Sequence, residues 1–395
     1  MTTENGAIGY ASSHDIVRFS AKRYEQSPYL AKYMNDQAVF GLYANRFYPL
    51  SLGGNPLEDY WKLRRGVMLY DVPEKPIEIK GLDAITLLEK VFARKISSLK
   101  VGRARYAIAC TPQGTILMDG VVIRLAQNRF WYVKANGEFD SLLQAYADGL
   151  EVTIRDPRSW VLQVQGPKAM DVLKVATKWQ VPSNFGYFHA GIFNFGGQEL
   201  LVSRTGWTGE MGFEVYSNEQ TDHHALWEHL MESGKLYGLQ FGSLESMGIR
   251  RIEAGILDNG TDIDTTMTPF EAGLGMFVDL SKPEFVGKKA LETADRRTLL
   301  FGLVSKMGVP SAGLEIFAND ELVGKITAGD WSPTLEKGIG YVRFSRHTDG
   351  NDGWLGKMVK LKDKNGRFHP SQVVSLPFYD AKKRIPRGLA TTDVD

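Results

Sequence analysis

The pattern of apolar and polar positions predicts a β-hairpin between residues 102 and 125. Residues 106–111 form a largely apolar run, residues 112–114 carry the Pro-Gln-Gly of a turn, and residues 116–123 return as the partner strand. Asp119 lies inside the second run. An unpaired carboxylate costs several kcal/mol when it is fully buried. Asp119 therefore either faces solvent or faces a cavity in which it does chemistry, and the pattern leaves both interpretations open.

The same reasoning predicts further strands over residues 76–81 and 160–166 and several helices. Asp83 is expected to cap a helix that runs to Val91. Apolar residues recur at helical spacing from Leu226 to Met231, and Gly234 ends that helix. Ser243 is expected to cap another helix, which carries Leu244, Met247, Ile252 and Ile256.

A glycine-rich stretch from Ser203 to Tyr216 is the most distinctive part of the chain. Its three glycines recur every third residue, and the alternation that follows predicts a strand that fixes the direction of Glu214. Trp207 lies within the turn. A planar heterocycle with an amino-pyrimidinone edge needs such a pair, a ring to stack on and an acceptor for two N–H donors. The alternative is an ordinary glycine-rich β-turn with a surface glutamate.

After a polar and basic break at residues 293–298, short apolar runs separated by turns predict a small barrel or sandwich. These runs cover residues 299–304, 314–317, 322–327 and 358–361. The predicted organisation is an N-terminal extension over 1–44, a core of two subdomains over 45–295, a C-terminal β-barrel domain over 296–382 and a tail over 383–395.

The composition of the chain bears on which classes of function and partner are expected. The 395 residues include 47 basic and 46 acidic side chains, so no bulk charge favours a nucleic-acid partner. A single cysteine excludes an intrachain disulfide.

No run approaches the ~18 apolar residues of a membrane span, and no secretory signal is visible at the start, so we expect no membrane association and a cytoplasmic location. The histidines at 223, 224 and 229 lack zinc-site spacing, which indicates a polar helix face, and no metal is expected.

Four segments together resemble the aminomethyltransferase (glycine cleavage T-protein) family. The resemblance covers roughly residues 45–380, with the segments in the family's order. They are Gln165-Gly166-Pro167-Lys168-Ala169; the run from Thr205 to Glu214; Arg251-Ile252-Glu253-Ala254-Gly255 with Thr268-Pro269-Phe270-Glu271-Ala272-Gly273; and Val323-Gly324-Lys325-Ile326-Thr327-Ala328-Gly329 with Leu376-Pro377-Phe378.

The resemblance implies an α+β fold, a three-domain disc with tetrahydrofolate in a central cavity and a small C-terminal β-barrel. By motif, Glu214 would accept from the pterin, Trp207 would pack on the folate in place of the usual tyrosine, and Tyr106 would line the same cavity. Asp119 corresponds to the second member of the family's paired aspartates and is the expected catalytic residue.

Two departures bear on the substrate. Met118 precedes Asp119 where the family usually has an aspartate, and Met247 takes the place of an arginine thought to help hold folate. Other features instead resemble the folate-dependent demethylases, such as dimethylsulfoniopropionate demethylase. They are Trp207 after a glycine, Asp59 and Trp61 with Leu63, and Asp119 with Val121 and Val122. The resemblance thus implies an enzyme that moves a methyl group from a small sulfonium or quaternary ammonium metabolite to folate N5. The alternatives are glycine cleavage aminomethyl transfer, methoxy-aromatic O-demethylation and non-catalytic folate binding.

Overall fold

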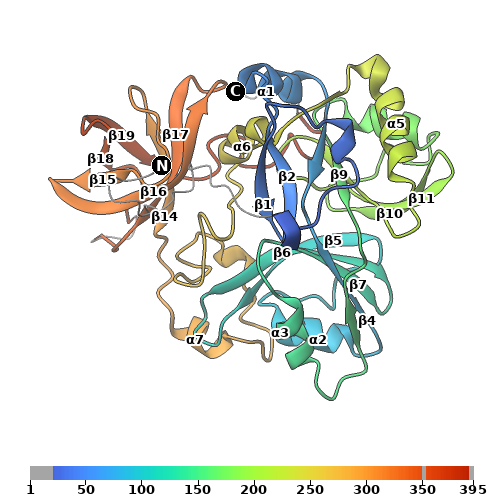
Figure 1. Cartoon of the computed structure of the whole chain (residues 1–395). Coiled ribbons are helices and arrows are strands. Elements are labelled where there is room, and N and C mark those ends of the chain that lie inside the picture. Colours follow the sequence, from blue (N-terminus) through green and yellow to red (C-terminus); the bar gives the residue numbers. More distant parts are fainter. Residues whose placement is uncertain (1–20, 349–352, 391–395) are drawn as a thin grey trace.

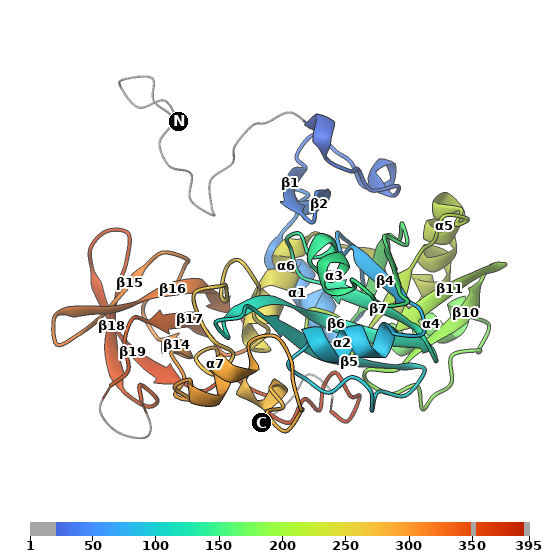
Figure 2. The same cartoon turned by 90° about the horizontal axis from the view of Figure 1, so that it is seen from below.

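The computed structural model describes residues 21–348 and 353–390, and it combines helices and strands in three parts (Figure 1). Two sheets lie beside each other, and a closed barrel lies to one side of them (Figures 1 and 2). This arrangement confirms the predicted α+β multi-domain fold with a C-terminal barrel. The predicted domain boundaries stay predictions, and the first 20 residues of the expected extension lie outside the described residues.

The first sheet has the strand order β10-β11-β12-β9-β3-β13. Its strands are antiparallel except for the β13–β3 pair. Helices α4 and α5 cover one face, where their apolar residues pack on Phe213, Val215 and Val202. The bounds are β3 Met68–Val72, β9 Val161–Gln165, β10 Ala190–Phe195, β11 Gln198–Ser203, β12 Gly212–Tyr216, β13 Gln240–Phe241, α4 Ala169–Ala176 and α5 His223–Gly234.

The second sheet has the order β5-β6-β7-β4-β8 and carries α2 and α3 on one face. Strands β5 and β6 are the predicted hairpin, and Gly114 in its turn has φ +81°. The opposite face packs on the first sheet through a shared apolar layer that includes Tyr70, Tyr216, Ile123 and Trp131. The bounds are β4 Pro76–Lys80, β5 Arg103–Cys110, β6 Ile116–Ala126, β7 Arg129–Lys134, β8 Thr153–Arg155, α2 Ala84–Val91 and α3 Asp140–Tyr146.

Connecting elements lie between these parts. The hairpin of β1 (Val39–Tyr43) and β2 (Arg46–Ser51) precedes α1 (Pro56–Arg65), which packs against α6 (Leu244–Glu253). The short elements are η1 Ala21–Arg23, η2 Leu30–Lys32, η3 Lys235–Tyr237, η4 Gly275–Phe277 and α7 Lys288–Thr293. Within the described ranges, no helix is both long enough and apolar enough to cross a bilayer.

The C-terminal part is a closed barrel in the order β14-β17-β16-β15-β18-β19, with β14 also paired to β19. Its interior is apolar and includes Leu303, Ile316, Val342 and Val373. The strands are β14 Leu300–Ser305, β15 Glu315–Ala318, β16 Glu321–Ser332, β17 Lys337–Phe344, β18 Met358–Lys362 and β19 Phe368–Val374. Closure removes the exposed strand edges that an open sheet would leave.

Two predicted helix caps are wrong in detail. Asp83 and Ser243 occupy the N-cap positions of α2 and α6, but neither side chain accepts a hydrogen bond from its own helix. The Asp83 carboxylate instead accepts from the backbone N–H of Glu151, 2.8 Å away, because the strand that follows α3 passes beside it. Helix α6 also ends at Glu253, before Ile256.

A buried ionic network joins α1, the glycine-rich loop, α6 and the barrel. Glu210 accepts from Arg64 and, at 2.8 Å, from Arg250. Arg250 also forms a 3.5 Å ion pair with Glu253. These four side chains are at most 1 % exposed. Glu253 further accepts from hydroxyl groups of α1, of the barrel and of the C-terminal segment, which are those of Tyr60, Ser332 and Tyr379.

We expect Arg250→Met to destabilise the protein by about 3–5 kcal/mol, because it leaves two carboxylates buried without their shared cation. Thermal unfolding followed by circular dichroism should show a melting temperature lower by roughly 10 °C, using about 2–4 °C per kcal/mol. The control is Arg346→Met, since Arg346 pairs with Glu321 at the surface, where both side chains are more than 60 % exposed. Equal shifts for the two variants would contradict the assigned importance of the network.

Candidate active site

Asp119 lies on β6 and does not face solvent, since only 7 % of the residue is exposed. Tyr106 of β5 donates its hydroxyl to Asp119 Oδ2 at 2.8 Å, and Asn259 donates its amide to Oδ1 at 3.0 Å. The structure therefore brings two of the predicted site residues, Tyr106 and Asp119, into direct contact. The surface interpretation of Asp119 is wrong, and the residue is a partnered, buried carboxyl group.

A second carboxyl group, Asp258, lies in the loop after α6 and acts electrostatically on Asp119. Burial raises the pKa of Asp119, the hydrogen bonds from Tyr106 and Asn259 oppose that rise, and the charge of Asp258 adds to it. Burial also raises the pKa of Asp258 itself. Two interacting carboxyl groups with raised proton affinity form the kind of pair that can hold and release a proton during a reaction.

The sequence analysis missed Asp258 because it sought the partner of Asp119 next to it in the chain. Met118 occupies that position, but its side chain points to the opposite face of β6 and packs in the apolar core under α2. Asp258 lies 139 residues further along. Arg251 of α6 holds its loop by pairing with Asp262, which also accepts from the backbone N–H of Asp258 at 2.9 Å.

Glu214 lies on β12 in a polar row that crosses three strands. Ser203 of β11 and Gln163 of β9 are its register partners. Thr205, Tyr216 and Ser203 all donate hydroxyls to Oε2, at 2.6, 2.5 and 3.1 Å, while Gln163 donates its amide to Oε1 at 2.9 Å. An ionised carboxylate has about four lone-pair sites, two on each oxygen. Only Oε1 of Glu214 therefore has room for a further donor, and its expected contact with pterin stays a prediction.

The glycines beside Trp207 have a structural cause that differs from the expected approach of a ligand. A Cβ at Gly206 or Gly212 would lie 2.2 or 2.1 Å from side-chain atoms of Gln165. Gly209 has φ +69°, and a Cβ there would lie 2.4 Å from Ala254. The spacing thus lets the loop wrap around Gln165 and the end of α6. Trp207 is half-buried, with the guanidinium of Arg251 5.0 Å from its ring centroid.

Glu74, in the connection between β3 and β4, is a further carboxyl group that the sequence analysis missed. Gln163 donates to Glu74 Oε1 at 3.3 Å, so this amide bridges Glu74 and Glu214. Burial and the charge of Glu214 raise the pKa of Glu74 to about 8. The hydroxyl of Tyr43, on β1, lies within electrostatic range of Glu74, Asp119 and Asp258. Burial, together with the charges of these three carboxyl groups, raises the pKa of Tyr43.

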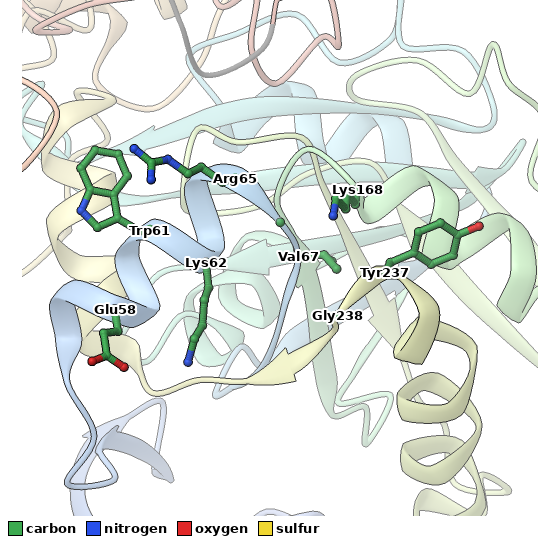
Figure 3. Close-up of a pocket in the computed structure, with 9 residues that line it drawn as sticks. Glu58, Trp61, Lys62, Arg65, Val67, Lys168, Tyr237 and Gly238 are labelled. Carbon is green, nitrogen blue, oxygen red and sulfur yellow. The ribbon is translucent and has the colours of Figure 1, made fainter.

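A surface hollow lies elsewhere, beside α1 (Figure 3). It has a volume of about 500 Å³ and contains none of the four predicted site residues. Its lining residues are Glu58, Trp61, Lys62, Arg65, Gly66, Val67, Lys168, Tyr237 and Gly238. Among the described residues, no group of three or more His, Cys, Asp or Glu side chains is arranged to hold a metal ion.

The two sheets, the barrel and the motifs carried by them define a known class of protein: the chain belongs to the glycine cleavage T-protein (aminomethyltransferase) family. The family's GCVT N-terminal domain matches residues 37–282, and its glycine cleavage T-protein C-terminal barrel domain matches residues 296–380. The family-level resemblance seen in the sequence is confirmed.

Individual relatives agree with this assignment. The chain is 30 % identical to the aminomethyltransferase of Bacillus subtilis (strain 168), over 82 % of this chain and 90 % of that protein. It is 34 % identical to the aminomethyltransferase of Caldanaerobacter subterraneus subsp. tengcongensis, over 78 % and 84 %. The crystal structure of glycine cleavage system aminomethyltransferase T from Bartonella henselae matches with a TM-score of 0.79 at 27 % identity, over 90 % and 98 %. These names do not confirm the demethylase branch.

We expect Asp119→Asn to lower kcat by ~10²–10⁴ and to leave the affinity for tetrahydrofolate nearly intact, if Asp119 transfers protons. If Asp119 only orients ligands, KM and kcat should both change, and kcat less steeply. Steady-state kinetics with a separate binding measurement distinguish these outcomes. A variant with rates within about threefold of the wild type would remove Asp119 from the site.

A pH prediction follows from Asp71, a buried carboxyl group of β3 whose pKa burial raises to about 7. The native state then binds a proton that the unfolded chain releases near its ordinary value of ~4. Stability should therefore fall as pH rises from about 4 to 7, by at most ~1.4 kcal/mol per pH unit for this group. Melting temperatures between pH 5 and 8 should decline less steeply for Asp71→Asn than for the wild type; identical slopes would contradict the assignment.

Proposed function

We propose that this protein is an aminomethyltransferase that passes a one-carbon unit from an amine-bearing donor to tetrahydrofolate. The observation that carries the proposal is the Asp119–Asp258 pair, in which each carboxyl group has a raised pKa. Proton transfer is central to this chemistry, because an amine departs readily only after its nitrogen has gained a proton. The names of the relatives, all aminomethyltransferases between 30 % and 34 % identical, support the same reaction class.

The polar groups around Glu214 fit a folate. A reduced pterin presents several N–H donors and ring acceptors along one edge, and it requires matching groups in a buried site. Glu214 Oε1 has room for one further donor, and the described chain supplies no partner for two neighbouring oxygens, Gln163 Oε1 and Glu74 Oε2. Bound tetrahydrofolate would supply the N5 and N10 nitrogens that take up the one-carbon unit.

Different residues of the chain would then have different roles in the reaction. Asp119 holds or releases the proton, and Asp258 keeps its proton affinity high through charge repulsion. Tyr106 and Asn259 fix the direction of the Asp119 carboxyl group through their two hydrogen bonds. Trp207, steadied by the Arg251 guanidinium, is the proposed stacking surface for the folate.

A second candidate is the demethylase reaction on a sulfonium or quaternary ammonium donor. Its specific support is that Glu74, Asp119 and Asp258 all act electrostatically on Tyr43, because several carboxyl groups and an aromatic ring suit a cationic methyl donor. Such a donor leaves neutral and needs no proton, so this reaction would not use the raised proton affinity of the Asp119–Asp258 pair.

Product analysis separates these reactions. Purified protein should convert tetrahydrofolate to methylene-tetrahydrofolate in the presence of an aminomethyl donor, as followed by chromatography. Formation of methyl-tetrahydrofolate from a sulfonium, ammonium or methoxy compound would instead support a demethylase. Folate binding without either product would support a non-catalytic role and would contradict the proposal.

Asp258→Asn gives a sharper test of the carboxyl pair. Removing the neighbouring charge lowers the pKa of Asp119, so the limb of the pH–rate profile that reports Asp119 should move to lower pH. We expect kcat to fall by roughly 10-fold or more. The matched control is Asp264→Asn, in the same loop, since Asp264 pairs with Arg343 and its side chain is 43 % exposed. An unmoved profile for Asp258→Asn would separate Asp258 from the chemistry.

A further inference from the structure

Two buried oxygens beside Glu214 have no hydrogen-bond partner in the described part of the chain. One is Oε1 of Gln163, a residue that is 0 % exposed, and the other is Oε2 of Glu74. A buried polar atom that lacks a partner destabilises a protein by about 1–3 kcal/mol. Two such atoms on side chains that already touch each other indicate a place where a ligand completes the hydrogen bonding.

The orientation of the Gln163 amide is set by its surroundings. Its Nε2 lies 2.9 Å from Glu214 Oε1 and 3.3 Å from Glu74 Oε1. The reverse orientation would place the amide oxygen against two carboxyl groups, and the N–H donors would be left unused. Oε1 of Gln163 is therefore the atom without a partner, and it acts as an acceptor.

The Glu74 carboxyl group supplies a hydrogen-bond donor next to these acceptors. Its Oε1 already accepts from Gln163, so the proton of the neutral acid belongs on Oε2. The raised pKa, about 8, keeps that proton in place at neutral pH. These three neighbouring side chains then offer a ligand two acceptors, Glu214 Oε1 and Gln163 Oε1, and one O–H donor, Glu74 Oε2.

We infer that Glu74 is a folate-recognition residue, which donates its carboxylic O–H to an acceptor atom of the ligand's amino-pyrimidinone ring while Gln163 and Glu214 accept from its N–H groups. This inference rests on the proposed function, since it assumes a pterin ligand. An amino-pyrimidinone edge carries N–H donors next to ring nitrogen and carbonyl acceptors. It therefore matches a site with both donors and acceptors better than a site of carboxylates, which only accept. Glu74 is then a specificity residue, and it takes no part in proton transfer at Asp119.

The test measures binding without turnover, by calorimetry with 5-formyltetrahydrofolate as the probe. Glu74→Ala should weaken binding by about 10-fold or more, because the donor is lost. Glu74→Gln keeps an N–H donor at the same place and should stay within about threefold of the wild type. Wild-type affinity in Glu74→Ala would overturn the inference, and so would equal losses in both variants.

Two controls make the result specific. Asp71→Asn removes another buried carboxyl group close to Glu74, but one that already accepts from Tyr33 at 2.8 Å, and it should leave the affinity unchanged. With fragments as probes, Glu74→Ala should weaken binding of 6-methyltetrahydropterin and leave p-aminobenzoylglutamate unaffected. The opposite fragment pattern would overturn the inference. Melting temperatures of all variants identify any loss that comes from unfolding.

The same experiment keeps the two proposals apart. If the wild-type protein binds no reduced folate, the proposed function fails before Glu74 is tested. If the wild type binds folate and forms methylene-tetrahydrofolate while Glu74→Ala binds equally well, the proposed function stands and the assignment of Glu74 is wrong.

Discussion

The buried network of Arg64, Glu210, Arg250 and Glu253 is the constraint on which the remaining arrangement depends. Its two positive and two negative charges cancel, and every one of these side chains is almost completely removed from water. Removing four charges from water is costly, and the cost is offset only when oppositely charged groups lie close together. These ion pairs form only while α1, the glycine-rich loop, α6 and the barrel keep one relative placement. The main contribution of the network is thus to a unique assembly of the domains rather than to net stability.

Helix α6 links the buried ionic network to the candidate active site. Successive helical residues point about 100° apart, so Arg250 faces the network while Arg251 faces the loop that follows the helix. Arg251 pairs with Asp262 and lies over Trp207. Through Asp262 it fixes the loop of Asp258 and Asn259, and this loop completes the surroundings of Asp119. One short helix therefore sets both the domain assembly and the geometry of the carboxyl pair.

Local sequence patterns predicted the helices and strands well, but they could not predict contacts between residues that are far apart in the chain. The hairpin of Asp119, the strand of Glu214 and the helix ending at Gly234 follow from periodicity and turn residues. The burial of Asp119 cannot be predicted from these patterns, because its hydrogen-bond partner Asn259 is 140 residues away in the chain. The glycine spacing was recognised, but its cause lies in Gln165, on another strand.

The carboxyl groups that were missed share a feature. Asp258 and Glu74 lie in connections without periodicity, where no pattern indicates which way a side chain points. For Glu74, one local signal exists: Pro73 and Pro76 flank a charged pair, Glu74-Lys75, and two prolines stiffen a short connection. A charged side chain held in so rigid a segment beside a buried strand is a reasonable candidate for a site residue.

The N-terminal hairpin, which carries no recognisable motif, places two side chains that interact electrostatically with carboxyl groups of the site. Burial is the largest cause of the raised pKa values of Glu74, Asp119, Asp258 and Glu214. Strand β1 places Tyr43 among three of these groups, and β2 places Arg46 where its charge opposes the rise at Glu74. Like charges that lie close together disfavour one another's ionisation, which adds to the effect of burial. Through Arg46, the hairpin thus opposes the protonation of Glu74.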